Sequence, residues 1–229
     1  MTATTPPAPP ASGVPALGER LRSARRARGE SVRGLARRIG CSASLLSQIE
    51  LGKSAPSVGV LYQLARALDV STDHLLGPAP QEDPAPRTLA PVPRAAGFGA
   101  LRALPPTQRV QVQRATDRQS VSFGGGVRWE RLTTTSDTRV DFLEIVYQPG
   151  ASSDEDDHPV DHPGVEYGVV VEGELTVHVD AESHTLGPGD SVAFDSGLPH
   201  LFRNTGTSTA RAVWFVVHAE NGPGSTARR

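Results

Sequence analysis

Apolar residues recur at the spacing of amphipathic helices over the first third of the chain. Leu17, Leu21 and Ala24 share one helical face, and the pattern returns over 32–39 and 58–68. A serine precedes three of the expected helices, where its hydroxyl can cap the first free backbone amides. These serines are Ser31, Ser42 and Ser57. The pattern therefore predicts four or five short helices, joined by tight turns, over residues 17–77.

Beyond residue 106 the hydrophobic pattern changes to alternation. Runs with alternating or densely β-branched side chains are separated by Gly, Pro, Asp or Asn. These runs are Val110–Val112, Ser120–Phe123, Val127–Leu132, Val140–Tyr147, Glu174–Val179 and Arg211–His218. Many short strands with no helical pattern between them are typical of a barrel or sandwich. We expect an all-β domain over residues 107–220.

Proline-rich segments separate these two regions. Residues 78–106 contain eight prolines and are predicted to form a semi-rigid, largely extended linker. Residues 1–16 and 221–229 are too poor in apolar side chains to fold, and we expect disordered tails there. At 229 residues the chain has the length for two domains with a core each.

Charge and cysteine content narrow the class of protein. Residues 17–77 hold ten Lys and Arg against five Asp and Glu, whereas residues 78–229 hold 13 against 20. A basic unit beside an acidic one suggests that the first faces a polyanion. The single Cys41 excludes an internal disulfide and a Cys-rich zinc module. With neither a signal peptide pattern nor an apolar run of bilayer length, we expect a cytoplasmic protein without a membrane partner.

Residues 31–57 carry the pattern of a DNA-reading unit. Two capped helices meet at a turn that contains Gly40, and the second helix is barely three turns long. On this second helix Leu46 and Ile49 face inward, while small or polar side chains face outward and let the backbone approach base edges. Gln48 is suited to pair with adenine, and Ala43 to contact a thymine methyl group.

Six motifs in this region agree in order and spacing with one known domain family. They are Leu35-Ala36, Ile39-Gly40, Leu46-Ser47-Gln48-Ile49-Glu50-x-Gly52-Lys53, Pro56-Ser57, Leu64-Ala65 and Leu75-Leu76-Gly77. Residues 17–77 thus resemble the lambda-repressor-like helix-turn-helix domain (Cro/C1 type, XRE family), a five-helix bundle. The resemblance implies DNA contacts through Arg33, Arg37, Ser42, Ala43, Ser44, Ser47, Gln48, Lys53 and Ser54. The alternative is an ordinary helical bundle whose arginines form a solvated face.

Two glycine-rich motifs mark the β domain. The first has Gly150, His162, Glu166 and Gly173, and the second has Gly189, Gly197, His200 and Asn204. They resemble the two motifs of the cupin superfamily, a double-stranded β-helix or jelly-roll barrel. The first departs from that pattern at Val160, where metal-binding cupins usually carry another histidine. The resemblance implies an effector pocket with His162, Glu166, Tyr167 and His200.

Two interpretations of this pocket remain open. His162, Glu166 and His200 can form a facial triad for a divalent ion (Fe, Zn, Ni or Mn), and His158 can replace the missing ligand after a loop shift. Alternatively the pocket is metal-free, and the same side chains hydrogen-bond an organic ligand. The acidic run 154–157 is interpreted as a solvated loop, or else as a mouth that attracts cationic ligands such as polyamines.

Four further aromatic residues of the β domain are given structural roles. Trp129 and Trp214 are interpreted as core or as pocket wall, and His184 and His218 as strand-edge residues.

These features together predict a transcriptional regulator, a repressor, that binds double-stranded operator DNA as a homodimer and responds to a small-molecule effector. We expect the cupin domain to form the dimer, and the proline-rich linker to transmit the response through its limited reach. The alternative is a non-heme iron enzyme of the phosphonate-epoxidase type with a vestigial helix-turn-helix domain. Its His-x-x-x-Glu…His ligand set would be matched by His162, Glu166 and His200.

Overall fold

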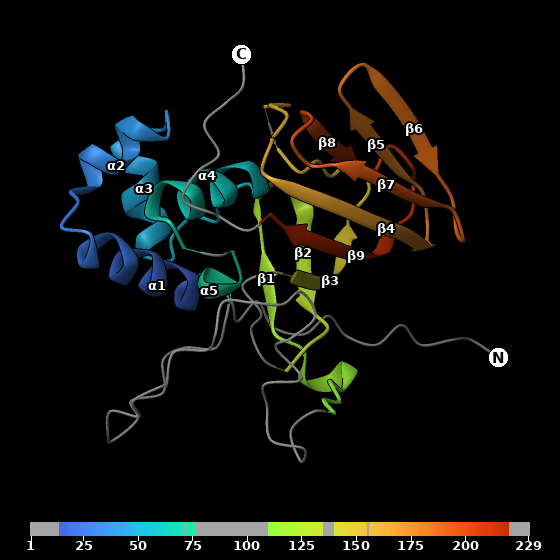
Figure 1. The fold of residues 1–229 in the computed structure, drawn as a ribbon, viewed down its shortest axis with the longest axis horizontal. Coiled ribbons are helices and arrows are strands. Elements are labelled where there is room, and N and C mark those ends of the chain that lie inside the picture. Colours follow the sequence, from blue (N-terminus) through green and yellow to red (C-terminus); the bar gives the residue numbers. More distant parts are fainter. Residues whose placement is uncertain (1–13, 71, 77–109, 135–139, 155, 220–229) are drawn as a thin grey trace.

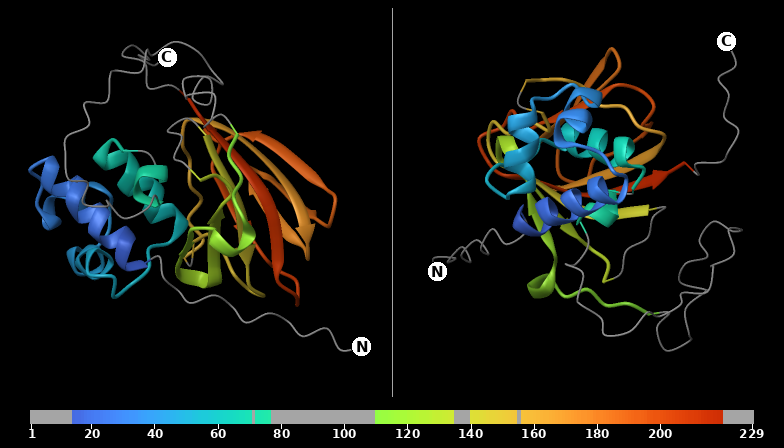
Figure 2. Two further views of the ribbon diagram at one scale, coloured as in Figure 1. Left: turned by 90° about the horizontal axis from the view of Figure 1, so that it is seen from below. Right: turned by 90° about the vertical axis from the view of Figure 1, so that its left-hand side faces the viewer.

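A computed structural model describes residues 14–70, 72–76, 110–134, 140–154 and 156–219. The predicted linker 78–106, the tail 221–229 and most of the tail 1–16 lie outside the described residues. Helices form the N-terminal part and two antiparallel sheets form the C-terminal part, and the helices pack against one side of the sheets (Figures 1 and 2). No helix in the described ranges is long and apolar enough to cross a membrane.

The N-terminal domain contains the five predicted helices. They are α1 (Val14–Ala27), α2 (Val32–Arg38), α3 (Ala43–Glu50), α4 (Val58–Leu68) and α5 (Thr72–Leu76). Helix α1 begins inside the segment that was predicted as a disordered tail. Pro15 does not prevent this, because the N–H that proline lacks would have no partner in the first turn of a helix. The three predicted serine caps are confirmed: Ser31, Ser42 and Ser57 each accept a hydrogen bond from the backbone N–H three residues later.

The core of this domain lies among α1, α2, α3 and α4. Leu35, Leu46 and Leu68 are fully buried there, and Ile49 is 1% exposed. After α2 and α3 the chain turns through Gly40 (φ 74°) and Gly52 (φ 66°), in the left-handed region that glycine adopts readily. The expected inward positions of Leu46 and Ile49 on α3 are therefore confirmed.

The C-terminal domain is the expected barrel-like pair of sheets. Its strands are β1 (Ser120–Ser122), β2 (Val127–Arg131), β3 (Val140–Tyr147), β4 (Gly164–Glu172), β5 (Leu175–Val179), β6 (Glu182–Leu186), β7 (Ser191–Asp195), β8 (His200–Arg203) and β9 (Ala210–His218). One sheet has the order β1-β2-β3-β9-β4-β7, and the other has the order β6-β5-β8. Short 3-10 turns lie at Ala115–Asp117 and Gly124–Gly126.

The predicted strand at Val110–Val112 is wrong. Both valines are exposed, at 80% and 59%, and no strand is assigned to them. Two β-branched residues in a short run are not enough to form a strand when no neighbouring strand supplies hydrogen bonds. By contrast, the hydrophobic pattern did not predict four strands that the structure contains. These are β4, β6, β7 and β8, and they lie within or beside the glycine-rich motifs.

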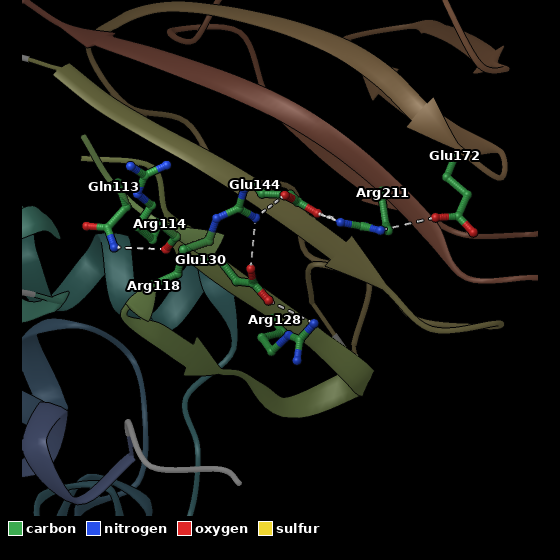
Figure 3. A network of polar contacts seen from close by, with 8 residues as sticks. All are labelled: Gln113, Arg114, Arg118, Arg128, Glu130, Glu144, Glu172 and Arg211. Carbon is green, nitrogen blue, oxygen red and sulfur yellow. Dashed lines mark hydrogen bonds and ion pairs between the residues drawn. The ribbon is translucent and has the colours of Figure 1, made fainter. Parts of the chain in front are cut away.

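The outer face of the larger sheet carries a chain of ion pairs (Figure 3). Glu144 on β3 lies between Arg118 and Arg211, and Arg211 also approaches Glu172 at 3.3 Å. Arg118 reaches Glu130 at 3.2 Å as well. These contacts tie β2, β3, β9 and β4 together across the sheet.

The two domains pack directly against each other. A single buried hydrophobic cluster contains Val58, Leu61 and Ala65 of α4 together with Trp129 and Ile145 of the barrel. Helix α4 also contributes Leu64 and Leu68 to the core around α3. It is therefore shared by both domains and lies between the other helices and the sheets (Figure 2).

Candidate DNA-binding surface and sensor pocket

Helix α3 presents polar side chains to solvent. Ser44 and Gln48 are exposed, while Ala43 and Ser47 are half-buried. The Ser42 hydroxyl accepts a hydrogen bond from Leu45 N at 3.1 Å, and its own proton stays available for a phosphate oxygen. A short helix with one buried and one exposed polar side has the form required of a helix that enters the major groove.

Basic and polar residues flank α3. Arg33 and Arg37 are exposed on α2, and Lys53 is exposed in the turn after α3, next to the half-buried Ser54. Lys53 N and Ser54 N both donate to the carbonyl of Gln48, at 2.9 and 3.3 Å, so this turn is fixed to the end of the helix. All nine predicted DNA-binding residues thus come from α2, α3 and their turns.

A buried ion pair holds the end of α3. Arg25 of α1 donates two hydrogen bonds to the Glu50 carboxylate, at 2.5 and 2.8 Å, and the two residues are 8% and 5% exposed. Arg25 also donates to the carbonyl of Glu30. This contact joins α1 to the last residue of α3, and so fixes the angle at which the polar side of α3 is presented.

The second candidate site is a polar cluster inside the barrel. His162 precedes β4, Glu166 lies on β4 and His200 begins β8, and all three are buried. Glu166 Oε1 lies 2.9 Å from His162 Nε2 and 3.3 Å from His200 Nε2. The other carboxylate oxygen, Oε2, accepts a hydrogen bond of 2.6 Å from the indole N–H of Trp214. The predicted triad is therefore brought together.

The charges of this cluster are strongly coupled. Burial raises the pKa of Glu166, but the contacts with His162 and His200 outweigh it and bring the pKa to about 2. Burial lowers the pKa of His200, but the Glu166 carboxylate outweighs that effect and raises the pKa above its usual value. The carboxylate therefore stays ionised and favours a positive charge next to it.

The donor atoms fit a divalent metal ion. The three ligand atoms lie within 4.8 Å of one another. His200 Nδ1 lies 2.8 Å from the carbonyl oxygen of Leu198, which holds the Nδ1 proton and leaves the Nε2 lone pair for a ligand. Trp214 occupies one oxygen of Glu166 and leaves the other facing both imidazoles. Lone pairs that converge in this way require a shared proton or a cation between them.

Helix α4 of the DNA-binding domain forms one wall of the same pocket. The ring of Tyr62 stacks on His162, with centroids 4.2 Å apart and an angle of 13° between the planes. Tyr62 also meets Trp129 edge-on at 6.1 Å. Val58 of α4 lines the cavity as well, together with the barrel residues Tyr147, Phe202 and Trp214. The pocket is thus mostly apolar, with both aromatic and aliphatic walls, and Glu166, His200 and Ser153 are its polar lining.

Comparisons with known proteins identify both domains. Residues 16–76 match the helix-turn-helix domain family, and residues 117–216 match the cupin domain family. The regulator PuuR of Escherichia coli is 26% identical over 198 residues, 86% of this chain and 92% of that protein. YazB of Bacillus subtilis, also an HTH-type transcriptional regulator, is 36% identical over 61 residues, 27% of this chain and 88% of its own length. The chain belongs to the XRE-type helix-turn-helix transcriptional regulators.

The solved structure of an HTH_3 family regulator from Vibrio cholerae covers 92% of this chain and 99% of its own. Its TM-score is 0.59 at 21% identity, which shows that the two proteins share their fold. The XRE-type regulator described here therefore combines a helix-turn-helix domain with a cupin domain, as the two sequence resemblances imply.

Two residues expected near the regulator's pocket lie elsewhere. Tyr167 follows the inward-facing Glu166 on β4, so its side chain projects from the opposite face of the sheet and is 51% exposed. The prediction that Tyr167 lines the pocket is therefore wrong, and the alternation of side chains along the strand explains why. His158 is largely exposed and lies 3.5 Å from Asp154, so it does not replace the missing ligand. Val160 lines the pocket at that position instead.

Two residues of the helical domain that contact the barrel were not predicted from the sequence. Tyr62 is one, and the signal for it is that α4 carries apolar residues on more than one side, which indicates a second packing partner. The other is Thr72, whose hydroxyl donates to Asp141 Oδ2 at 2.7 Å. His218, interpreted as a strand-edge residue, reaches the same oxygen at 2.8 Å. Trp214 is confirmed as pocket wall.

Proposed function

We propose that this regulator represses transcription by binding a near-palindromic operator as a homodimer, and that a small molecule in the cupin pocket changes this binding. The observation that carries the proposal is the exposed polar side of α3, capped by Ser42 and anchored by Leu46 and Ile49. In this arrangement Gln48 and Ala43 meet base edges, while Lys53 and the α2 arginines meet phosphates.

A two-fold dimer is supported by the outer face of the larger sheet. Paired positions on the adjacent strands β4 and β9 carry exposed apolar side chains, with Tyr167 opposite Phe215 and Val165 opposite Val217. An apolar patch of this kind is typical of a protein interface. A second copy is the occupant we propose, because helix-turn-helix domains read half-sites about one helical turn, roughly 34 Å, apart.

The dimer is tested with Tyr167→Glu, which places a charge in the patch and leaves the pocket unchanged. Sedimentation velocity should show a dimer for the wild type and a monomer for the variant. A wild-type monomer at micromolar concentration, or a variant that dimerises equally well, contradicts this surface.

The pocket contributes the effector site. Glu166 and His200 supply polar contacts inside a mostly apolar cavity, which is the composition of small-molecule sites. A divalent ion held by His162, Glu166 and His200 would act as a Lewis acid that anchors an effector's oxygen or nitrogen. Metal analysis of protein purified without chelator tests this part: about one ion per chain supports it, and Glu166→Gln should lose the ion. No metal in the wild type favours direct hydrogen bonding of the effector.

The operator is identified by selection from a randomised duplex pool. We expect the selected sequences to converge on two inverted half-sites spaced by about one helical turn. A Gln48→Ala variant should select a site with relaxed preference at one position in each half-site. A pool that never converges would contradict sequence-specific binding.

A further inference from the structure

Tyr62 occupies room inside the sensor pocket although it belongs to the DNA-binding domain. Its ring covers one face of His162 and contacts Trp129, so it lies where a planar ligand of the barrel would stack. The cavity that remains beside Glu166 and His200 has room for about one water molecule. That room admits a metal ion, but an organic effector of several heavy atoms needs the volume that Tyr62 fills.

Specific polar contacts hold α4 in this position. Ser57 donates to Asp154 Oδ2 at 2.9 Å, and Val58 N donates to the carbonyl of Ser153 at 3.1 Å. Thr72 of α5 also donates to the buried Asp141 of β3 at 2.7 Å. These contacts join α4 and α5 to the barrel, so the ring of Tyr62 leaves the pocket when the helical domain moves away.

Val160, where metal-binding cupins usually have a histidine, lies in the contact between α4 and the barrel. A Cβ atom added to Gly59 of α4 would lie 2.8 Å from Val160 Cγ1 and 3.3 Å from Asp154 Oδ2. Helix α4 therefore approaches the barrel so closely that a side chain at position 59 would force Val160 or the helix to shift. The position where metal-binding cupins have a histidine serves here as part of the domain interface.

From these contacts we propose that Tyr62 is a built-in occupant of the effector site, which a small planar molecule replaces by stacking on His162. Effector binding and docking of α4 on the barrel then exclude each other. The exclusion is reciprocal, because a ligand that binds only the undocked state shifts the population toward that state. This inference rests on the proposed function of the pocket as effector site, and it makes Tyr62 the residue that sets the effector's shape.

Tyr62→Ala tests the occupant directly, with p-cresol as the probe because it matches the lost side chain. Isothermal titration of full-length protein should show p-cresol binding to the variant at least about tenfold more tightly than to the wild type, since the competing ring is gone. Tyr62→Phe is the matched control, because it keeps the ring and should bind as weakly as the wild type. Equal affinity for wild type and Tyr62→Ala, or no binding to Tyr62→Ala, overturns the proposal.

Gly59→Ala tests the exclusion with Tyr62 left in place. The added methyl group pushes α4 off Val160, so p-cresol should bind this variant more tightly than the wild type. Gly59→Ala combined with Val160→Ala restores the space and should return the affinity toward the wild-type value. A Gly59→Ala variant with wild-type affinity contradicts the exclusion.

Docking of α4 on the barrel is measured by the distance between two spin labels, one at Ser44→Cys on α3 and one at Ser183→Cys on β6, both exposed sites. The labelled protein carries Cys41→Ser and is diluted with unlabelled protein. The wild type should give one narrow distance, and Gly59→Ala a broader distribution that p-cresol shifts further. Distances that p-cresol leaves unchanged in Gly59→Ala overturn the proposal. None of these readouts involves DNA, so a failure to bind an operator would count against the proposed function and leave this result standing.

Discussion

The proposed DNA-reading surface and the proposed effector pocket are built in opposite ways. The reading surface comes from one continuous stretch, residues 33–54, whose helices are fixed by local caps and turns. The pocket joins α4, β4, β8 and β9, which are far apart in the sequence and belong to both domains. The difference shows that a surface made of consecutive helices can be specified by local rules, whereas this pocket depends on the packing of distant segments.

The largest predicted loss of stability concerns the ion pair between Arg25 of α1 and Glu50 at the end of α3. Glu50→Gln leaves Arg25 buried without its ionic partner, and we expect a loss of about 3–5 kcal/mol in the free energy of unfolding of the helical domain. Glu30→Gln is the control, because its pair with Arg38 is more exposed (side chains 20% and 47% exposed) and should contribute only about 0–1 kcal/mol. Urea unfolding followed by circular dichroism measures both, and equal losses would contradict a special role of the buried pair.

The pocket has a comparable polar anchor. Trp214→Phe removes the N–H that Glu166 Oε2 accepts, which should cost about 1–3 kcal/mol of stability. Trp129→Phe is the matched control, since the Trp129 indole N–H has no hydrogen-bond partner among the described residues. Thermal unfolding of the two variants should therefore separate them, with Trp214→Phe the less stable. The reverse order would show that Glu166 does not depend on this bond.

Two variants of the reading surface separate base contacts from phosphate contacts. Gln48→Ala should weaken operator binding by about 1–3 kcal/mol and leave binding to random DNA almost unchanged. Lys53→Ala should weaken both alike and reduce the slope of log affinity against log salt by about one. Anisotropy titrations at several salt concentrations give both quantities. Identical patterns for the two variants would mean that α3 is oriented differently on the duplex.

The smallest effect belongs to the sheet that supports the pocket. Burial raises the pKa of Glu144, but its hydrogen bonds with Arg211 and Arg118 outweigh this and lower the pKa below its usual value. The ionised carboxylate therefore adds stability above the unfolded-state pKa of about 4.3, and this stability is lost as the pH falls through the lower folded-state value. Glu144→Gln should be less stable than the wild type at neutral pH, and the gap should close in acid. A gap independent of pH would contradict it.

The sequence predicted most features that depend on neighbouring residues, and few of those that depend on contacts between the two domains. The caps at Ser31, Ser42 and Ser57 follow from residue type and periodicity, and so do the inward positions of Leu46 and Ile49. The triad of His162, Glu166 and His200 was found through family motifs, because nothing in its spacing shows that His200, on the smaller sheet, reaches Glu166 on the larger one.

The misses have physical causes. Tyr167 lies outside the pocket because successive side chains of a strand point to opposite faces of the sheet, and its neighbour Glu166 points inward. The contact between Tyr62 and His162 could not be predicted, since it depends on how two domains dock. The apolar character of α4 on several sides indicates only that a partner exists, not which one.

The most direct test of the central claim is a competition experiment on the full-length protein. Its selected operator and a shuffled duplex of the same length and base composition compete for binding at physiological salt. We predict that the operator binds at least about a thousandfold more tightly than the shuffled duplex. Equal affinity for the two duplexes would contradict the assignment of α3 as a reader of DNA sequence.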